Sequence, residues 1–181
     1  MLLKFSKISD MPSDVIDKYC HQVPSELLHL WKNYGLGYLL NGYLKVINPD
    51  VYLEFVRRTY FRGALSIPIF LTAFGDIVTL EEQKYLRLVR YKDGDFISIL
   101  ENMHYFLDDL EDEGLLEDYF EIPLYEEAVR RFGSLSYEQC FGFVPLLSVG
   151  GKKDIANIDK VSIKEYLSLI TQFTGGVGID D

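Results

Sequence analysis

The sequence predicts an α+β protein in which helices flank a curved, mainly antiparallel sheet. Strand-like runs follow one another at hairpin spacing, most clearly in residues 85–91 and 96–100, which flank an Asp93-Gly94 turn. Runs with apolar residues at helical spacing stand before and after these strands. Because helices and strands do not alternate regularly, the pattern favours an antiparallel sheet over a parallel one.

The first third of the chain contains two predicted helices with a strand, GYLKVI at 42–47, between them. Pro24 starts the first helix and Gly35 ends it, as the residue that follows the C-cap. Asn48 and Pro49 cap the second helix, and arginines near its end favour its macrodipole. The apolar face predicted for this second helix consists of Val51, Tyr52, Phe55, Val56 and Tyr60.

The later elements follow from turn and capping signals. Pro68 interrupts the apolar run at 65–74 and indicates a bulge, an edge or the end of a strand. Two short strands within 137–147 and 154–161 are expected to be joined by a glycine-containing turn. The last predicted helix, at 162–174, begins with a capping box formed by Ser162 and Glu165. The other late helices are predicted at 101–112 and 123–132.

Composition indicates a globular protein of the cytoplasm. The chain has 181 residues, and 48% of them are hydrophobic, which suffices for one compact unit with a buried core. Cys20 and Cys140 are too few for a disulfide framework and are expected to be reduced thiols. The sequence has neither a signal-peptide pattern nor an apolar run of membrane-spanning length, so no membrane association is expected.

No pattern predicts a catalytic, cofactor-binding or metal site, and the chain is therefore not expected to be an enzyme. The glycines at 35–37 and 175–178 follow helices, whereas a phosphate-binding turn precedes one. The histidines lack the spacing of zinc ligands. Residues 109–120 resemble a calcium loop, but Phe120 stands where the bidentate glutamate is needed.

The negative charge is concentrated in one segment. The net charge is −10, and residues 93–129 hold 13 of the 28 acidic side chains without any Lys or Arg. The rest of the chain carries 18 basic and 15 acidic side chains, which is a net +3. Direct binding of nucleic acid is therefore not expected, because phosphate backbones attract basic surfaces.

Part of this acidic segment falls at the end of the helix predicted at 101–112, where the macrodipole disfavours negative charge. Two other predicted helices place arginines at that end, Arg57 and Arg58 in one and Arg130 and Arg131 in the other. The exception therefore suggests a surface that binds a basic protein partner. The alternative is a solvated face that only increases solubility. The predicted partner-binding residues are Asp108, Asp109, Glu111, Asp112, Glu113, Glu117 and Asp118.

Five stretches occur in an order that resembles the GAD-like domain proteins. They are WKNYGLG (31–37), NGYLKVINP (41–49), IPIFLTAFGDI (67–77), YEEAVRRFGSLSYEQCFGFVPLLSVGG (125–151) and EYLSLITQFTGG (165–176). The C-terminal part resembles immunity proteins paired with type VI secretion DNase toxins, and LLHLWKNYG is more loosely similar to the SUKH immunity superfamily. The recurrent family positions are matched by Trp31, Tyr34, Gly35, Gly37, Gly42, Pro49, Phe74, Gly75, Asp76, Cys140, Phe141, Gly142 and Pro145.

The resemblance implies a non-enzymatic protein that neutralises a cognate antibacterial toxin, a basic nuclease, by occluding its active-site surface or by steering onto it. It divides the chain into a GAD-like part at 1–100 and an immunity-type part at 101–181, packed as one unit. Two alternatives stay open. One is a small-ligand-binding or enzymatic domain with a pocket between sheet and helices, and the other is an interaction module without a toxin.

Overall fold

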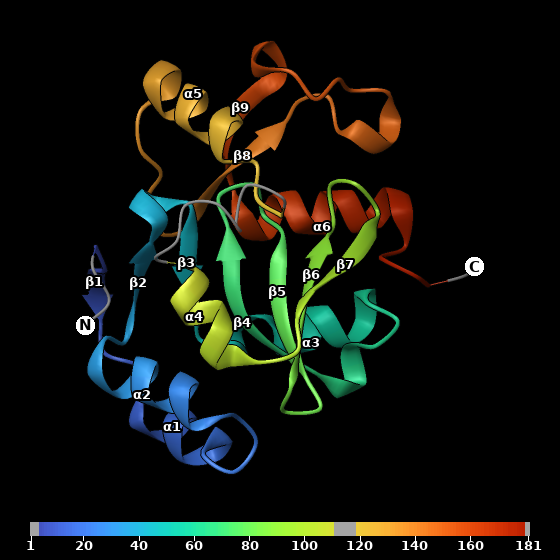
Figure 1. Cartoon of the computed structure of the whole chain (residues 1–181). Coiled ribbons are helices and arrows are strands. Elements are labelled where there is room, and N and C mark those ends of the chain that lie inside the picture. Colours follow the sequence, from blue (N-terminus) through green and yellow to red (C-terminus); the bar gives the residue numbers. More distant parts are fainter. Residues whose placement is uncertain (1–3, 111–118, 180–181) are drawn as a thin grey trace.

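The computed structural model describes residues 4–110 and 119–179, and it confirms the α+β class with an antiparallel sheet (Figure 1). Seven strands form one sheet in chain order, and each pairs antiparallel with the next. These strands are β1 Ser6–Ser9, β2 Leu36–Leu39, β3 Leu44–Val46, β4 Ser66–Thr72, β5 Ile77–Glu81, β6 Tyr85–Arg90 and β7 Asp95–Leu100. A second sheet pairs β8 Gln139–Phe143 with β9 Ile158–Ser162.

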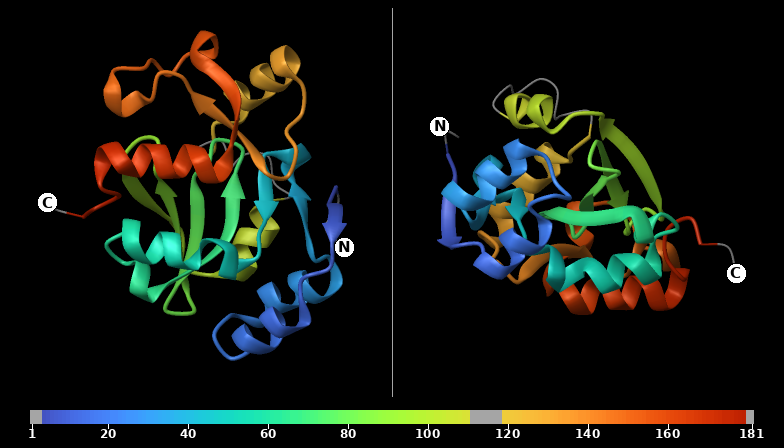
Figure 2. Two further views of the ribbon diagram at one scale, coloured as in Figure 1. Left: turned by 180° about the vertical axis from the view of Figure 1, so that it is seen from behind. Right: turned by 90° about the horizontal axis from the view of Figure 1, so that it is seen from below.

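Helices cover both faces of the large sheet and create two cores. On one face lie α3 Pro49–Thr59 and α6 Ile163–Thr174, whose apolar residues form one buried cluster with the sheet (Figure 2). The other cluster contains residues of α1 Ser13–Tyr19, α2 Ser25–Asn33, α4 Met103–Asp109 and α5 Ile122–Phe132. The small sheet lies beside α5 at one end of the molecule (Figure 1).

The Gly35-Leu36-Gly37 stretch is required by close backbone packing. Gly35 has a φ of +76° and its N–H donates to the carbonyls of Leu30 and Trp31, which confirms that it follows the C-cap of α2. A Cβ on Gly35 would lie 2.3 Å from the carbonyl oxygen of Ser9, and one on Gly37 would lie 2.3 Å from that of Ser6. Both glycines therefore allow β1 to approach the start of β2.

Other sequence-based expectations are also confirmed. The register of β4 shifts between Pro68 and Phe70, which is the bulge indicated by the proline. Strands β6 and β7 form the hairpin predicted around Asp93 and Gly94. Trp31, which matches a recurrent family position, is 1% exposed and lies in the core.

Several details of the prediction were wrong. Val51 is 47% exposed, because the buried face of α3 is formed by Pro49, Tyr52 and Val56. The strand predicted at 42–47 is shorter, because the preceding residues belong to a 3-10 turn at Leu40–Gly42. Ser162 precedes α6, but its side chain makes no capping hydrogen bond; it is also the last residue of β9.

The C-terminal part is tied to the large sheet by a buried charge network centred on Lys92. Its ammonium lies 2.5 Å from Asp76 Oδ2, 2.9 Å from Asp93 Oδ2 and 3.0 Å from Glu121 Oε2. The side chains of Lys92 and Asp76 are 2% and 3% exposed. Burial disfavours the ammonium, but the three carboxylates outweigh burial and raise the pKa of Lys92 above its ordinary value. Lys153 closes the network by pairing with Asp93 and Glu121.

Lys92→Met should lower the free energy of unfolding by about 3–5 kcal/mol, because it leaves the carboxylate of Asp76 buried without its cation. The change can be measured by urea denaturation followed both by Trp31 fluorescence and by far-UV circular dichroism. Lys84→Met is the matched control, since Lys84 pairs with Glu101 at the surface and should shift the midpoint little. Equal midpoints for the two variants would contradict a structural role for the network.

Two glycines allow the energetic cost of close packing to be measured apart from the cost of the backbone conformation. Gly35 and Gly94 share a φ of +76°, but an added Cβ on Gly94 meets nothing within 4 Å. Gly94→Ala should cost about 1–2 kcal/mol for the left-handed conformation alone. Gly35→Ala should cost about 3 kcal/mol or more, because the backbone of β1 must also move. Denaturation midpoints of the two variants check this. Similar losses of stability in both would show that the close approach of β1 to Gly35 adds no cost.

Candidate functional site

The acidic helix α4 is fixed to the core by its apolar face. Asn102 caps the helix, since its side-chain oxygen accepts a hydrogen bond from the backbone N–H of His104 at 2.8 Å. Met103 and Phe106 are buried, and the ring of Phe106 lies 5.5 Å from that of Phe70 in β4. Met103 and Phe106 therefore lie on the inward face of α4, and the opposite face points to solvent.

We term four residues the α4 surface, namely the exposed His104, Tyr105 and Asp108 and the half-buried Asp109. The side chain of Asp108 is 67% exposed, and its carboxylate lies 3.5 Å from Nε2 of His104. Tyr105 is 60% exposed and its ring lies 5.7 Å from the His104 ring. Tyr105 was not among the predicted partner-binding residues, although an aromatic residue on the polar side of an amphipathic helix can indicate an interface.

The structure describes only two of the predicted partner-binding residues. Asp108 and Asp109 lie in the last turn of α4, which has no basic residue, and the helix ends at Asp109 rather than at residue 112. Leu110 is the C-cap, and its N–H donates to the carbonyl of Phe106. The other predicted residues lie outside the described residues; they are Glu111, Asp112, Glu113, Glu117 and Asp118. The same holds for most of the calcium-loop-like segment.

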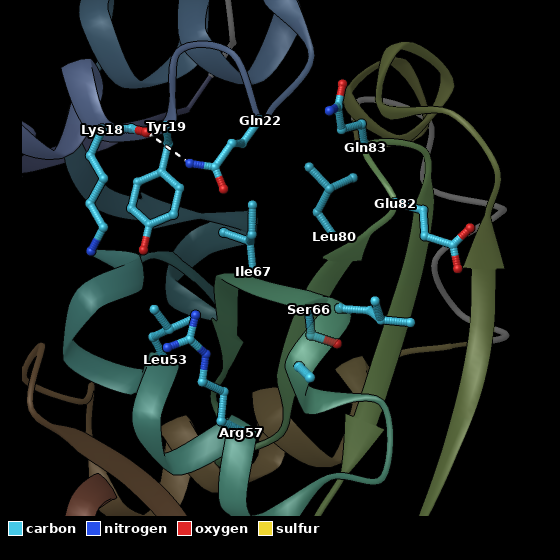
Figure 3. Close-up of a pocket in the computed structure, with 12 residues that line it drawn as sticks. Lys18, Tyr19, Gln22, Leu53, Arg57, Ser66, Ile67, Leu80, Glu82 and Gln83 are labelled. Carbon is cyan, nitrogen blue, oxygen red and sulfur yellow. Dashed lines mark hydrogen bonds between the residues drawn. The ribbon is translucent and has the colours of Figure 1, made fainter.

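A pocket of about 350 Å³ lies between helices and the sheet, and we term it the α1–α3 pocket (Figure 3). In Figure 3, Lys18, Tyr19 and Gln22 approach from one side and Arg57 approaches from α3 on the other. Apolar side chains lie between them, and the β5–β6 turn closes one end. The lining residues are Lys18, Tyr19, Gln22, Leu53, Arg57, Ala64, Leu65, Ser66, Ile67, Leu80, Glu82 and Gln83.

The alternative of an enzyme with a pocket between sheet and helices requires a catalytic constellation there, and the pocket contains no histidine or cysteine. All three histidines are exposed. The buried carboxylates are engaged elsewhere, Asp76 with Lys92 and Glu81 with Arg62 and Arg87. The described residues thus bring no buried carboxylate together with a histidine.

Cys140 is fully buried, and burial raises the pKa of its thiol to about 12. A thiol with so high a pKa is almost entirely protonated at neutral pH and is a poor nucleophile. Cys140 is thus a free thiol, as expected, and lies in the core.

Within residues 4–110 and 119–179, no group of three or more His, Cys, Asp or Glu residues is placed to hold a metal ion. The helices of this same part of the chain are all too short or too polar to cross a membrane. The arrangement instead offers two solvent-facing features, an acidic helix end and a pocket with exposed cationic side chains, which suit protein recognition.

Comparison with known proteins identifies the family. Residues 2–91 match the GAD-like domain, and residues 100–174 match the C-terminal domain of the type VI secretion system immunity protein Tdi1. A crystal structure of Atu4351 from Agrobacterium tumefaciens has the same fold, with a TM-score of 0.77 and 17% identity over 93% of this chain and 85% of that chain. Curated protein sequences give no significant match. The two family matches together identify the chain as a GAD-like protein of the type VI secretion immunity type.

Proposed function

We propose that this protein binds a cognate antibacterial toxin, a basic nuclease, and blocks its activity in a tight one-to-one complex. The observation that carries the proposal is the match of residues 100–174 to an immunity-protein domain, because α4 and its acidic end belong to this part. A nuclease must present a basic cleft to DNA, and such a cleft is complementary to the acidic segment at 93–129. We place this activity in the cytoplasm, where the toxin reaches DNA.

The α4 surface can act in two ways, which differ in their kinetics. If the carboxylates occupy the DNA-binding cleft, they replace phosphates and the complex dissociates slowly. If they only attract the toxin, they raise the association rate and leave the dissociation rate unchanged. In either case Tyr105 supplies an exposed aromatic ring beside the carboxylates, a residue type enriched in the energetically dominant part of interfaces.

The protein itself needs no catalysis for this role. Inhibition by binding requires a rigid surface, and α4 is held to the core by Phe106 and Leu110, which are 0% and 7% exposed. We also propose that the GAD-like part at 1–100 and the immunity-type part at 101–181 act as one unit, because the Lys92 network contains residues of both.

Co-expression with the toxin encoded by the neighbouring gene should restore growth to cells that the toxin otherwise kills, and the two proteins should co-elute as a complex. An unrelated protein of similar net charge is the control, since it tests whether negative charge alone protects. If this protein neither rescues growth nor forms a complex, the proposed function is wrong.

The combined change of Asp108→Lys and Asp109→Lys should have opposite effects on stability and on binding. Positive charge at the end of α4 favours the macrodipole, so each change should raise the free energy of unfolding by about 0.3–1 kcal/mol. The association rate with the toxin should fall, and the fall should be larger at low salt.

Asp159→Lys combined with Glu165→Lys is the matched control, because it makes the same change in net charge at exposed positions outside α4 and outside the α1–α3 pocket. Stopped-flow association and denaturation of both double variants separate local from global charge. An equal loss of association rate in both would show that the α4 surface has no special role. A change confined to the dissociation rate of the α4 variant would favour occlusion over steering.

A further inference from the structure

The charged residues that line the α1–α3 pocket are not equally neutralised. Lys18 Nζ lies 2.5 Å from Asp50 Oδ1, and Glu82 Oε1 lies 2.7 Å from Nη2 of Arg62. Arg57 forms no ion pair with any described residue. Among the residues that the structure describes, the pocket therefore contains one guanidinium that no carboxylate pairs with, in a protein whose net charge is −10.

The side chain of Arg57 carries this charge into the pocket (Figure 3). It leaves the last turn of α3 and, in Figure 3, extends into the pocket towards Tyr19 rather than away from it. Arg58, the next residue, is 71% exposed and pairs with Glu54 of its own helix at 3.7 Å. Both arginines complement the macrodipole of α3, so this role alone does not distinguish them. Only Arg57 lines the pocket.

The floor of the pocket is apolar and suits the stem of a side chain. Leu80 is 1% exposed, Leu53 and Ile67 are half-buried, and Leu65 at the rim is 52% exposed. The amides of Gln22 and Gln83 add hydrogen-bonding groups at the edge. A ligand that suits this lining has a short apolar stem and one carboxylate, which is the chemistry of an acidic side chain on a protein surface.

We propose that the α1–α3 pocket receives an acidic side chain of the bound toxin, whose carboxylate pairs with the guanidinium of Arg57 while its methylenes pack on Leu53, Ile67 and Leu80. This site deepens the proposed function and rests on it. All lining residues lie within the GAD-like match at 2–91, so the GAD-like part also contacts the partner. The toxin then meets a cationic site here and an acidic one at α4, and opposite charges at two places fix its orientation.

The experiment compares Arg57→Glu with Arg58→Glu in the full-length protein. Both variants lose one arginine from the end of α3 and should unfold at similar denaturant concentrations. Only Arg57→Glu should weaken the complex with the neighbouring-gene toxin, by at least about tenfold in Kd measured by titration calorimetry. Leu65→Ser should weaken it several-fold, whereas Val149→Ser, which removes an apolar side chain of similar exposure away from the pocket, should not.

The outcomes separate this site from the proposed function. If the wild-type protein forms no complex, both proposals fail. If the wild-type protein binds and Arg57→Glu binds equally well, the pocket proposal alone is wrong. A charge swap tests whether the bound group is a carboxylate. Replacing the contacting acidic residue of the toxin by arginine should restore binding to Arg57→Glu. Failure of every such toxin variant to restore binding would overturn the assignment of a carboxylate.

Discussion

The buried ion pair between Asp76 and Lys92 is the interaction on which the arrangement of the two parts depends. A carboxylate that is 3% exposed is tolerable only beside a cation, and the ammonium of Lys92 in turn requires Asp93 and Glu121. Glu121 is the residue that precedes α5, so its contact with Lys92 fixes the start of this helix beside the large sheet. Ala73 lies in the same turn as Asp76, and its carbonyl accepts a hydrogen bond from the backbone N–H of Phe141. This hydrogen bond holds β8 against the large sheet.

A second buried lysine joins the same two parts without any carboxylate. Lys45 of β3 is fully buried and donates to the backbone carbonyls of Ser136, Tyr137 and Gln139. Burial without a counter-ion lowers the pKa of Lys45 to about 8. The two lysines thus act differently: Lys92 neutralises buried acids, whereas Lys45 donates hydrogen bonds to backbone carbonyls at and just before the start of β8. Together they make the packing of the small sheet specific, because a polar group misplaced in the core costs more than an apolar one.

The sequence predicted those parts of the fold that local periodicity and turn chemistry determine. Helix α2 and the β6–β7 hairpin were predicted from a few neighbouring residues, and the bulge at Pro68 was one of three alternatives that the proline indicated. Strand β1 was not predicted, because its residues are all exposed and its pairing of Ser6 with Tyr38 is non-local. The charge networks could not be predicted for the same reason, since nothing in the order of residues shows that Glu121 approaches Lys92.

The candidate sites differ in the same way. The acidic residues at the end of α4 are neighbours in the sequence, and so counting the charges along the chain predicted them. The α1–α3 pocket gathers residues from positions 18 to 83, and the sequence assigned Arg57 only to the end of its helix. The matched family positions Trp31, Phe74 and Phe141 are at most 1% exposed, so changing them disrupts packing. Exposed residues of α4 and the pocket rim can change at little cost to stability. Under the proposed function, the protein can therefore change how it recognises a toxin at these two surfaces, while the buried residues Met103 and Phe106 keep α4 fixed against the sheet.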